Sequence, residues 1–183
     1  MQDIKLDFHR QARVWIEDRP QAIYPASETL TKTLGSKLTI NSRKKRGSLE
    51  ILIPVGARFF YGLLGAEFIP NDSGIFSLEV LVSTNHEKIY EQSIASKLDQ
   101  IRVGLPSEYS ESVIDAVIKF LDKERLTRFG SGVLRFEQAA HSEIGSSNKF
   151  FRHIATTVVQ LLVADHANNA QEVTKIVTRS SLV

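Results

Sequence analysis

The spacing of apolar residues switches between two periods along the chain, and the order of the switches indicates a fold class. Apolar and polar residues alternate in several early stretches, as in strands with one buried face. Residues 107–125 instead repeat apolar positions at helical spacing; a strand-like stretch follows at 133–137, and the helical pattern returns at 146–167. The sequence therefore predicts an α+β domain of two layers, a β-sheet backed by two helices on one face.

Each predicted helix has a start. Pro106 and Ser107 precede the first, and Glu108 in its first turn has the charge that favours the helix dipole. Ser146 and Ser147 offer a cap for the second. A run of β-branched residues weakens the helical interpretation of 146–167, but this stretch is too long for a typical strand.

The remaining segments are assigned by alternation and by turn residues. Prolines mark 20–29 as an irregular connection, and the stretch 86–103 fits either a helix or a short strand. The turn sequence Asn71–Gly74 joins two strand-like stretches, which predicts a β-hairpin. The predicted strands are 4–8, 37–40, 49–53, 61–69, 75–82 and 133–137, and 14–16 either continues the first or begins another.

Composition and motifs argue against catalysis and against a bound cofactor or metal. The chain has 183 residues, which suits one domain, and no cysteine, which excludes disulfides and thiolate metal sites. The glycines form neither a phosphate-binding loop nor a dinucleotide-binding fingerprint, and the five histidines form no ligand motif. We therefore expect no cofactor, no metal site, no catalytic residues and no enzymatic activity.

The same composition bears on location. No apolar run approaches the roughly 18 residues that span a membrane, and the first ten residues are too charged for a signal peptide. We expect a cytoplasmic protein with no membrane partner. The net charge is +2, so local basic patches have to be judged one by one.

Two local patterns are candidates for binding. The run Arg43, Lys44, Lys45 and Arg46 could bind phosphates, although a solvated hairpin tip is the favoured explanation by about two to one. The second pattern is Arg58-Phe59-Phe60-Tyr61, in which an arginine stands beside aromatics, as in base-stacking sites and protein hot spots. We expect at least one of these two phenylalanines to pack in the core.

Three segments, taken in order, resemble the fourth domain of elongation factor G and related translational GTPases. Gly56-Ala57-Arg58-Phe59-Phe60-Tyr61-Gly62 resembles the family's G-G-R-G-Q-Y-G stretch, and Gly104-Leu105-Pro106-Ser107-Glu108-Tyr109 resembles the start of its first helix. His141 with Ser146, Ser147 and Phe150 resembles the segment that opens its second helix. The resemblance covers residues 49–165; we expect a domain at 49–183, with residues 1–48 adding strands or an arm.

This resemblance implies a specific fold and a function. The fold is that of the second domain of ribosomal protein S5, with a left-handed β-α-β crossover. The family uses two loops, which correspond to 56–61 and 139–147, to contact RNA in the ribosome; the matching residues are Arg58, Tyr61 and His141. Phe59 and Gly145 depart from the pattern: the first replaces a glycine, the second an acidic residue.

Three functions follow, in order of preference. The first is a non-catalytic module that binds structured RNA, such as the ribosome, through Arg58, Tyr61, His141 and the basic run. The second is a protein-interaction module, either a homodimer or a receptor for another protein, that kept the fold without RNA binding; Phe59 and Phe60 favour it. The least favoured is a small-molecule enzyme.

Overall fold

A computed structural model describes residues 1–6, 9–35, 43–85, 87–164 and 169–180, which form an α+β protein. Eight strands in this described part make one mixed sheet, ordered β1-β2-β4-β5-β8-β6-β3, with β7 also paired to β8. Four helices accompany the sheet. The strands are β1 (Gln2–Lys5), β2 (Gln11–Ile16), β3 (Glu28–Gly35), β4 (Lys45–Val55), β5 (Arg58–Pro70), β6 (Phe76–Val82), β7 (Arg102–Val103) and β8 (Gly132–His141); the helices are α1 (Ser107–Phe120), α2 (Lys123–Phe129), α3 (Asn148–Val163) and α4 (Ala170–Ser180).

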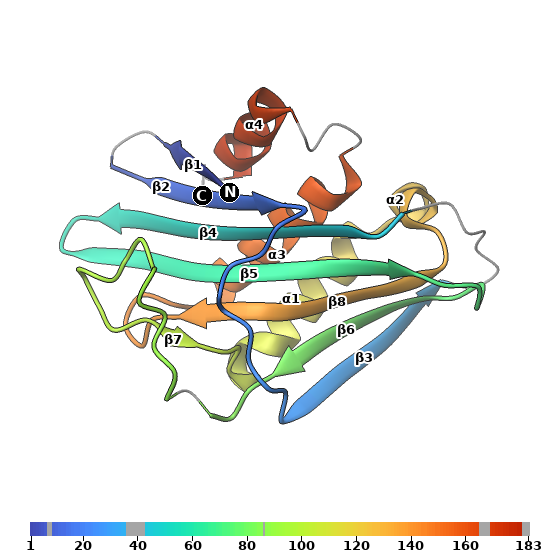
Figure 1. The fold of residues 1–183 in the computed structure, drawn as a ribbon, viewed down its shortest axis with the longest axis horizontal. Helices are drawn as coiled ribbons and strands as arrows, with labels where there is room; N and C mark the ends of the chain where they lie inside the picture. Colours follow the sequence, from blue (N-terminus) through green and yellow to red (C-terminus); the bar gives the residue numbers. More distant parts are fainter. Residues whose placement is uncertain (7–8, 36–42, 86, 165–168, 181–183) are drawn as a thin grey trace.

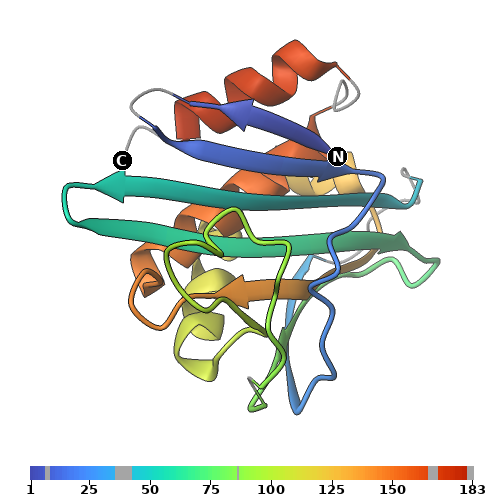
Figure 2. The ribbon, with the colours of Figure 1, turned by 60° about the vertical axis from the view of Figure 1, so that its left-hand side comes forward.

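The helices lie on one face of the sheet and are seen behind it in Figure 1 and again in Figure 2. The opposite face, which we call the open face, is crossed by the segment that leads from β2 to β3 (Figure 1). That segment touches β8, where the N–H of Ala139 donates to the carbonyl of Ala22 at 3.1 Å. The central strands are therefore covered on both sides, by helices behind and by irregular chain in front.

The apolar core fills the helix-facing side. Strand alternation places Phe68 and Phe76 on this face, where their rings meet Phe129 at the end of α2, with centroids 5.0 and 5.6 Å away. Tyr109 of α1 stacks on Phe151 of α3 at 4.8 Å. The two amphipathic helices thus pack on each other as well as on the sheet, as their apolar periodicity predicts.

The predicted hairpin of 61–69 with 75–82 is wrong. β8 lies between β5 and β6: it pairs antiparallel with β5 and parallel with β6. The turn at 71–74 is present, but Ser131 enters it; its hydroxyl donates to the carbonyl of Asn71 at 2.7 Å and accepts the N–H of Gly74 at 3.0 Å. A turn sequence indicates that the chain reverses, not that the two flanking strands pair.

The single helix predicted at 107–125 is two helices. α1 ends at Phe120 and α2 begins at Lys123, because Asp122 caps the second helix by accepting the N–H of Arg125 at 2.9 Å. Apolar spacing continues across this break and therefore conceals it. The second predicted helix is confirmed as α3, with Ser147 as its cap; the Ser147 hydroxyl accepts the N–H of Phe150 at 3.3 Å.

The N-terminal part of the chain joins the same sheet. The stretch predicted as irregular at 20–29 gives way to β3, an exposed edge strand paired with β6. Residues 14–16 belong to a strand of their own, β2, which pairs with β1 and β4. β4 runs across the expected domain boundary at 48/49. The expected strand at 37–40 lies outside the described residues. The ambiguous stretch 86–103 consists mainly of turns and ends in β7.

Candidate functional site

The two loops singled out by the resemblance meet at one end of the sheet, which we call the tip (left in Figure 1). β4 and β5 are joined by the two-residue turn Gly56-Ala57, and Gly56 has φ +60°, as the first position of a type II′ turn requires. Next to it, the N–H of Tyr61 donates to the carbonyl of Gly145 at 2.8 Å, and the Ser146 hydroxyl donates to the carbonyl of Tyr61 at 2.8 Å. The loop after β8 is therefore attached to the first residues of β5.

Phe59 explains both departures from the family pattern. A Cβ atom on Gly145 would collide with the ring of Phe59, so a bulky residue at one position goes with a glycine at the other. The loop is closed further by Ser142, whose hydroxyl donates to Asp99 and accepts the N–H of Gly145 at 2.8 Å. Phe59 is partly buried against the core, whereas Phe60 is 42% exposed, so the expectation that one of them packs inside is confirmed.

The three residues matched to the family differ in accessibility. Arg58 is exposed at the first position of β5. Tyr61 is fully buried, with its hydroxyl donating to Glu50 at 2.8 Å, and His141 is 5% exposed, with Nδ1 3.0 Å from the carbonyl oxygen of Gly104. Arg58 can touch a partner directly, whereas Tyr61 and His141 can only hold the two loops in place.

The basic run lies at the other end of the sheet, about 33 Å along β4 at ~3.3 Å per residue. Lys44 Nζ is 3.0 Å from Glu67 Oε1, and Arg46 Nε donates to the same oxygen at 2.8 Å. Lys45 Nζ lies 5.8 Å from the ring centroid of Phe129, and Arg43 is exposed. Burial raises the pKa of Glu67, but hydrogen bonds and charge from Lys44 and Arg46 outweigh it and lower the pKa below its ordinary value.

A pocket of about 260 Å³ opens at the tip, between the sheet and the first turns of α3. We call it the tip pocket. Alternation along β4 and β5 turns Ile53, Val55 and Phe60 to the helix side, the side on which Gly62 faces α3. A Cβ on Gly62 would lie 2.6 Å from Ile154 Cδ1, so glycine lets the helix approach the sheet here. Besides the three sheet residues, the pocket is lined by Arg10, Ser147, Lys149, Phe150 and His153.

The lining of the tip pocket combines aromatic rings with positive charge. The ring centroids of Phe60 and Phe150 are 5.8 Å apart, and those of Phe150 and His153 are 6.3 Å apart. Burial lowers the pKa of His153, and among the described residues its Nε2 atom has no hydrogen-bond partner. Arg10 and Lys149 bring cations, and none of the described lining residues carries a carboxylate. Such a lining suits an anionic partner with a flat apolar group.

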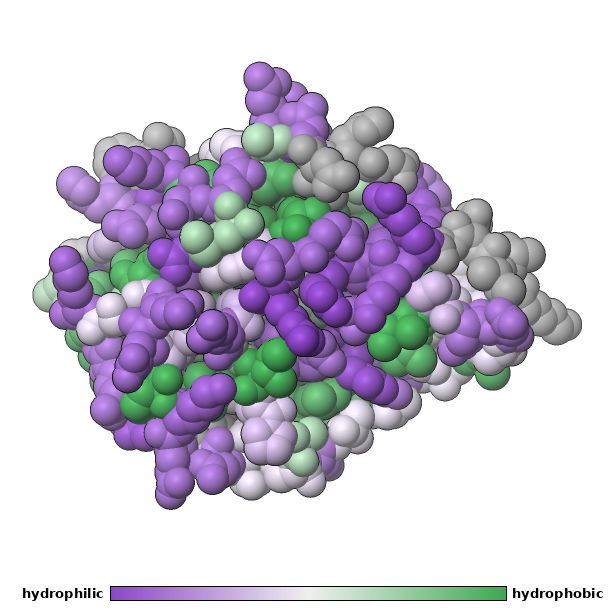
Figure 3. All heavy atoms as spheres, viewed as in Figure 1, coloured by the Kyte–Doolittle hydropathy of each residue, from purple (hydrophilic) through white to green (hydrophobic). Residues whose placement is uncertain are grey.

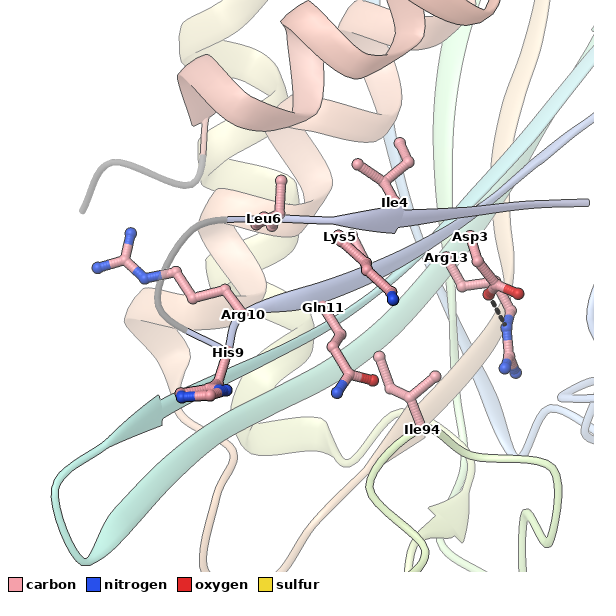
Figure 4. A pocket seen from close by; sticks show the side chains of 10 residues that line it. Asp3, Ile4, Lys5, Leu6, His9, Arg10, Gln11, Arg13 and Ile94 are labelled. Atoms are coloured by element: carbon pink, nitrogen blue, oxygen red, sulfur yellow. Dashed lines mark hydrogen bonds and ion pairs between the residues drawn. The ribbon is translucent and has the colours of Figure 1, made fainter.

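A larger hollow of about 560 Å³ lies along the β1–β2 hairpin (Figure 4). Lys5 and Gln11 point toward Ile94 across it, and Asp3 pairs with Arg13 at 2.8 Å on one side. Its lining carries charges of both signs, in contrast to the tip pocket.

The open face, which is hydrophilic across its middle (Figure 3), holds one fully buried carboxylate, Glu50. Its Oε1 accepts the Tyr61 hydroxyl and the N–H of Ile94 at 3.1 Å, and its Oε2 lies 3.5 Å from Arg13 Nη1. Burial raises the pKa of Glu50; these hydrogen bonds and the charge of Arg13 act in the opposite direction. Arg13 also donates to the carbonyl of Gln92 at 2.9 Å, so this cluster holds the segment around 92–94 against the sheet.

Sequence reasoning missed the tip pocket as a site, because its residues come from β4, β5, the start of α3 and Arg10 before β2. Phe60 had drawn attention as an aromatic beside an arginine, and Ser147 and Phe150 as parts of the segment that opens the second helix. Within the described residues, no three His, Asp or Glu side chains are grouped as metal ligands, and none of the helices is both long and apolar enough to cross a membrane. Comparison with protein-family models and with curated proteins finds no match to this chain.

Proposed function

We propose that this protein is a non-catalytic binding module that binds structured RNA, such as ribosomal RNA, through its tip. The observation that carries the proposal is the meeting of loops 56–61 and 139–147, which presents the exposed Arg58 beside a pocket lined by Arg10 and Lys149 and by no carboxylate of the described residues. Arginine and lysine side chains attract phosphates, and release of counterions supplies affinity.

The chain path supports the resemblance to the fourth domain of elongation factor G. Three strands (β4, β5, β6), a helix, a strand and a helix follow one another, with a short α2 inserted before β8. In Figure 1, β6 and β8 both run to the left, β8 lies above β6 and α1 lies behind the sheet, so this connection turns with the left hand. Most such connections are right-handed, and the left hand is the one that the resemblance implies.

The residues take different roles in this function. Arg58 contacts phosphates, while Tyr61 and His141 position the loops from inside. The basic run contributes less, because Lys44 and Arg46 are held by a shared carboxylate, Glu67, at the far end of the sheet. A partner that spans both ends would have to cover the full length of β4.

Sedimentation with small ribosomal subunits tests the proposal, at roughly 50 and 200 mM salt, a range over which phosphate contacts are strongly weakened. We expect co-sedimentation at the lower salt and its loss at the higher. The same assay with Arg58→Glu controls for the site. Wild-type protein that stays in the supernatant at both salts, and that binds no structured RNA in a filter assay, would overturn the function.

A protein-interaction module is the second candidate, favoured by one observation. Three large apolar residues are exposed in the loops and strands of the tip: Ile144 at 77%, Val55 at 51% and Phe60 at 42%. Exposed apolar residues that lie close together mark interaction sites. This candidate predicts a partner, or a second copy of the chain, whose binding withstands 200 mM salt, which the sedimentation series separates from RNA binding.

A further inference from the structure

We propose that the tip pocket receives one unpaired base of the bound RNA, with its flanking phosphates on Arg58, Arg10 and Lys149. This inference rests on the proposed function and names the part of an RNA that the site selects. A site that binds only phosphates would accept a continuous duplex. A base pocket would not, because a continuous duplex offers no free base to enter it.

The size of the pocket limits what can enter. Its volume of about 260 Å³ lies below the roughly 300–1,000 Å³ typical of sites for drug-sized ligands. One ring system fits such a space, whereas a base with its sugar and phosphates does not. The backbone of the RNA must then stay outside, at the rim.

The apolar surfaces of the pocket match the face of a base. Phe60 reaches the pocket from β5 with 42% of its surface exposed, although its neighbour Phe150 is 8% exposed. The two rings are inclined by 30°, so Phe150 supports Phe60 from the inside and leaves the outer face of Phe60 open. An exposed aromatic that is held by a buried one is the arrangement of a stacking platform, and it tolerates any base.

The cations occupy the rim on the same side. Arg58 and Phe60 are two residues apart on β5, so their side chains leave the strand on one face; Val55 lies opposite Arg58 on β4. Lys149 is the second residue of α3, two positions after the capping Ser147. The phosphates on either side of an inserted base would therefore meet positive charge on both the strand side and the helix side.

His153 offers the pocket a polar contact. Its Nε2 atom is buried and, within the described residues, without a hydrogen-bond partner. Because burial lowers the pKa of His153, the imidazole is neutral near pH 7, and its Nε2 can donate to or accept from the edge of a base. A buried polar atom without a partner is costly, and a base edge would remove that cost.

Two RNA hairpins of equal length and charge, each closed by a non-nucleotide linker in place of a loop, test the inference; one carries a single bulged 2-aminopurine and the other is fully paired. Stacking quenches 2-aminopurine fluorescence, so insertion is seen directly. We expect the protein to prefer the bulged hairpin by about tenfold, within the roughly 1–3 kcal/mol that stacking of one base contributes. Phe60→Ala should remove both the preference and the quenching, and Phe60→Trp should keep them.

Ile75→Ala serves as the matched control, since Ile75 is an exposed apolar residue, at 39%, that lies outside both tip loops and outside the lining of the pocket; it should behave as wild type. Equal binding of the two hairpins by wild type, or a preference that survives Phe60→Ala, overturns the base pocket and leaves RNA binding by the tip intact. Binding of neither hairpin overturns the proposed function itself. Arg58→Glu should weaken both hairpins alike.

Discussion

The two ends of the sheet carry arginines in different surroundings: one is paired with a carboxylate and the other is exposed. At the far end, Arg46 and Lys44 share the carboxylate of Glu67, and Lys45 lies over the ring of Phe129. At the tip, Arg58 is exposed, and the nearby pocket has Arg10 and Lys149 in its described lining but no acid. Two cations of the dense run therefore share one carboxylate, whereas no carboxylate of the described residues lines the tip pocket.

This difference shows why a run of basic residues is a weak indicator of a binding site. A cation attracts a phosphate in proportion to the charge that its own neighbours leave uncompensated, and the neighbours of Arg46 come from another strand. Glu67 stands opposite Arg46 in the β4–β5 pairing, 21 residues away in sequence. Removing or reversing charges at each end distinguishes the cations that share a carboxylate from the exposed cation at the tip.

The largest effect is expected for Glu67→Gln, which breaks the compensated end. Two cations lose their shared carboxylate, and Arg46 is only 23% exposed at its side chain. The free energy of unfolding should fall by about 2 kcal/mol at pH 7, the order of a hydrogen bond to a charged group, as measured by denaturant titration. Glu79→Gln is the control: within the described residues Glu79 pairs with Arg135, at 2.7 Å, and this variant should lose less stability.

The same substitution has a pH dependence of known sign. The pKa of Glu67 is lowered in the folded state, so its contribution to stability is present above the ordinary glutamate value of 4.5 and is lost as pH falls through the lowered pKa. The gap between wild type and Glu67→Gln should therefore narrow when unfolding is repeated in increasingly acidic buffer. A gap that widens in acid would contradict the assignment of the Lys44 and Arg46 contacts.

The next effect compares Arg58→Glu with Arg43→Glu, two exposed arginines at opposite ends. Reversal at the tip should weaken binding of a structured RNA by about tenfold, or 1.4 kcal/mol, and lower the slope of log affinity against log salt by about 1. Reversal at the far end should change affinity by less than about twofold, because a charge outside the contact area acts only through screened solvent. Equal losses would place both ends in the RNA contact.

A smaller effect is expected for Ser147→Ala, which removes the cap of α3 at the tip without changing charge. The free energy of unfolding should fall by about 1 kcal/mol, the usual cost of losing such a cap. Ser107→Ala is the matched control, because no side chain caps α1. If both variants lose the same stability in a thermal melt, the Ser147 hydrogen bond does not hold the helix start.

The smallest effect at neutral pH is expected for Glu50→Gln, midway along β4, but its sign is opposite to that of Glu67. The pKa of Glu50 is raised by burial, so wild-type stability from this residue is greatest below the ordinary value of 4.5 and declines as pH rises through the raised pKa. Glu50→Gln should gain on wild type as pH rises from about 4.5. Glu111→Gln, on the exposed side of α1, provides a control for loss of a carboxylate in solvent.

The sequence predicted the positions of individual helices and strands better than it predicted which strands pair with each other. Apolar period and caps located α3 and the Ser147 cap, because these depend on residues a few positions apart. Strand order depends on contacts between distant segments, so nothing near 71–74 indicated that β8 would separate β5 from β6. β3 was missed because its residues are mostly exposed and show little alternation.

The candidate site divides in the same way. The resemblance brought the two loops together, and the structure has them bonded through Tyr61, Gly145 and Ser146. Burial of Tyr61 depends on Glu50 from the neighbouring strand, which a motif does not contain. The tip pocket draws on β4, β5, the start of α3 and Arg10 before β2, and local sequence singled out Phe60, Ser147 and Phe150 without indicating that they meet.

The position of β8 also affects the order in which the chain can fold. The β4–β5 hairpin is local and can close as soon as residue 70 is made, whereas β6 has its central partner only after some 50 further residues have been added. Until then, the facing edges of β5 and β6 have unpaired backbone groups, and an unpaired edge is where strands of other chains can attach. A chain interrupted before residue 132 would carry two such edges, so truncated products of this protein should aggregate more readily than the complete one.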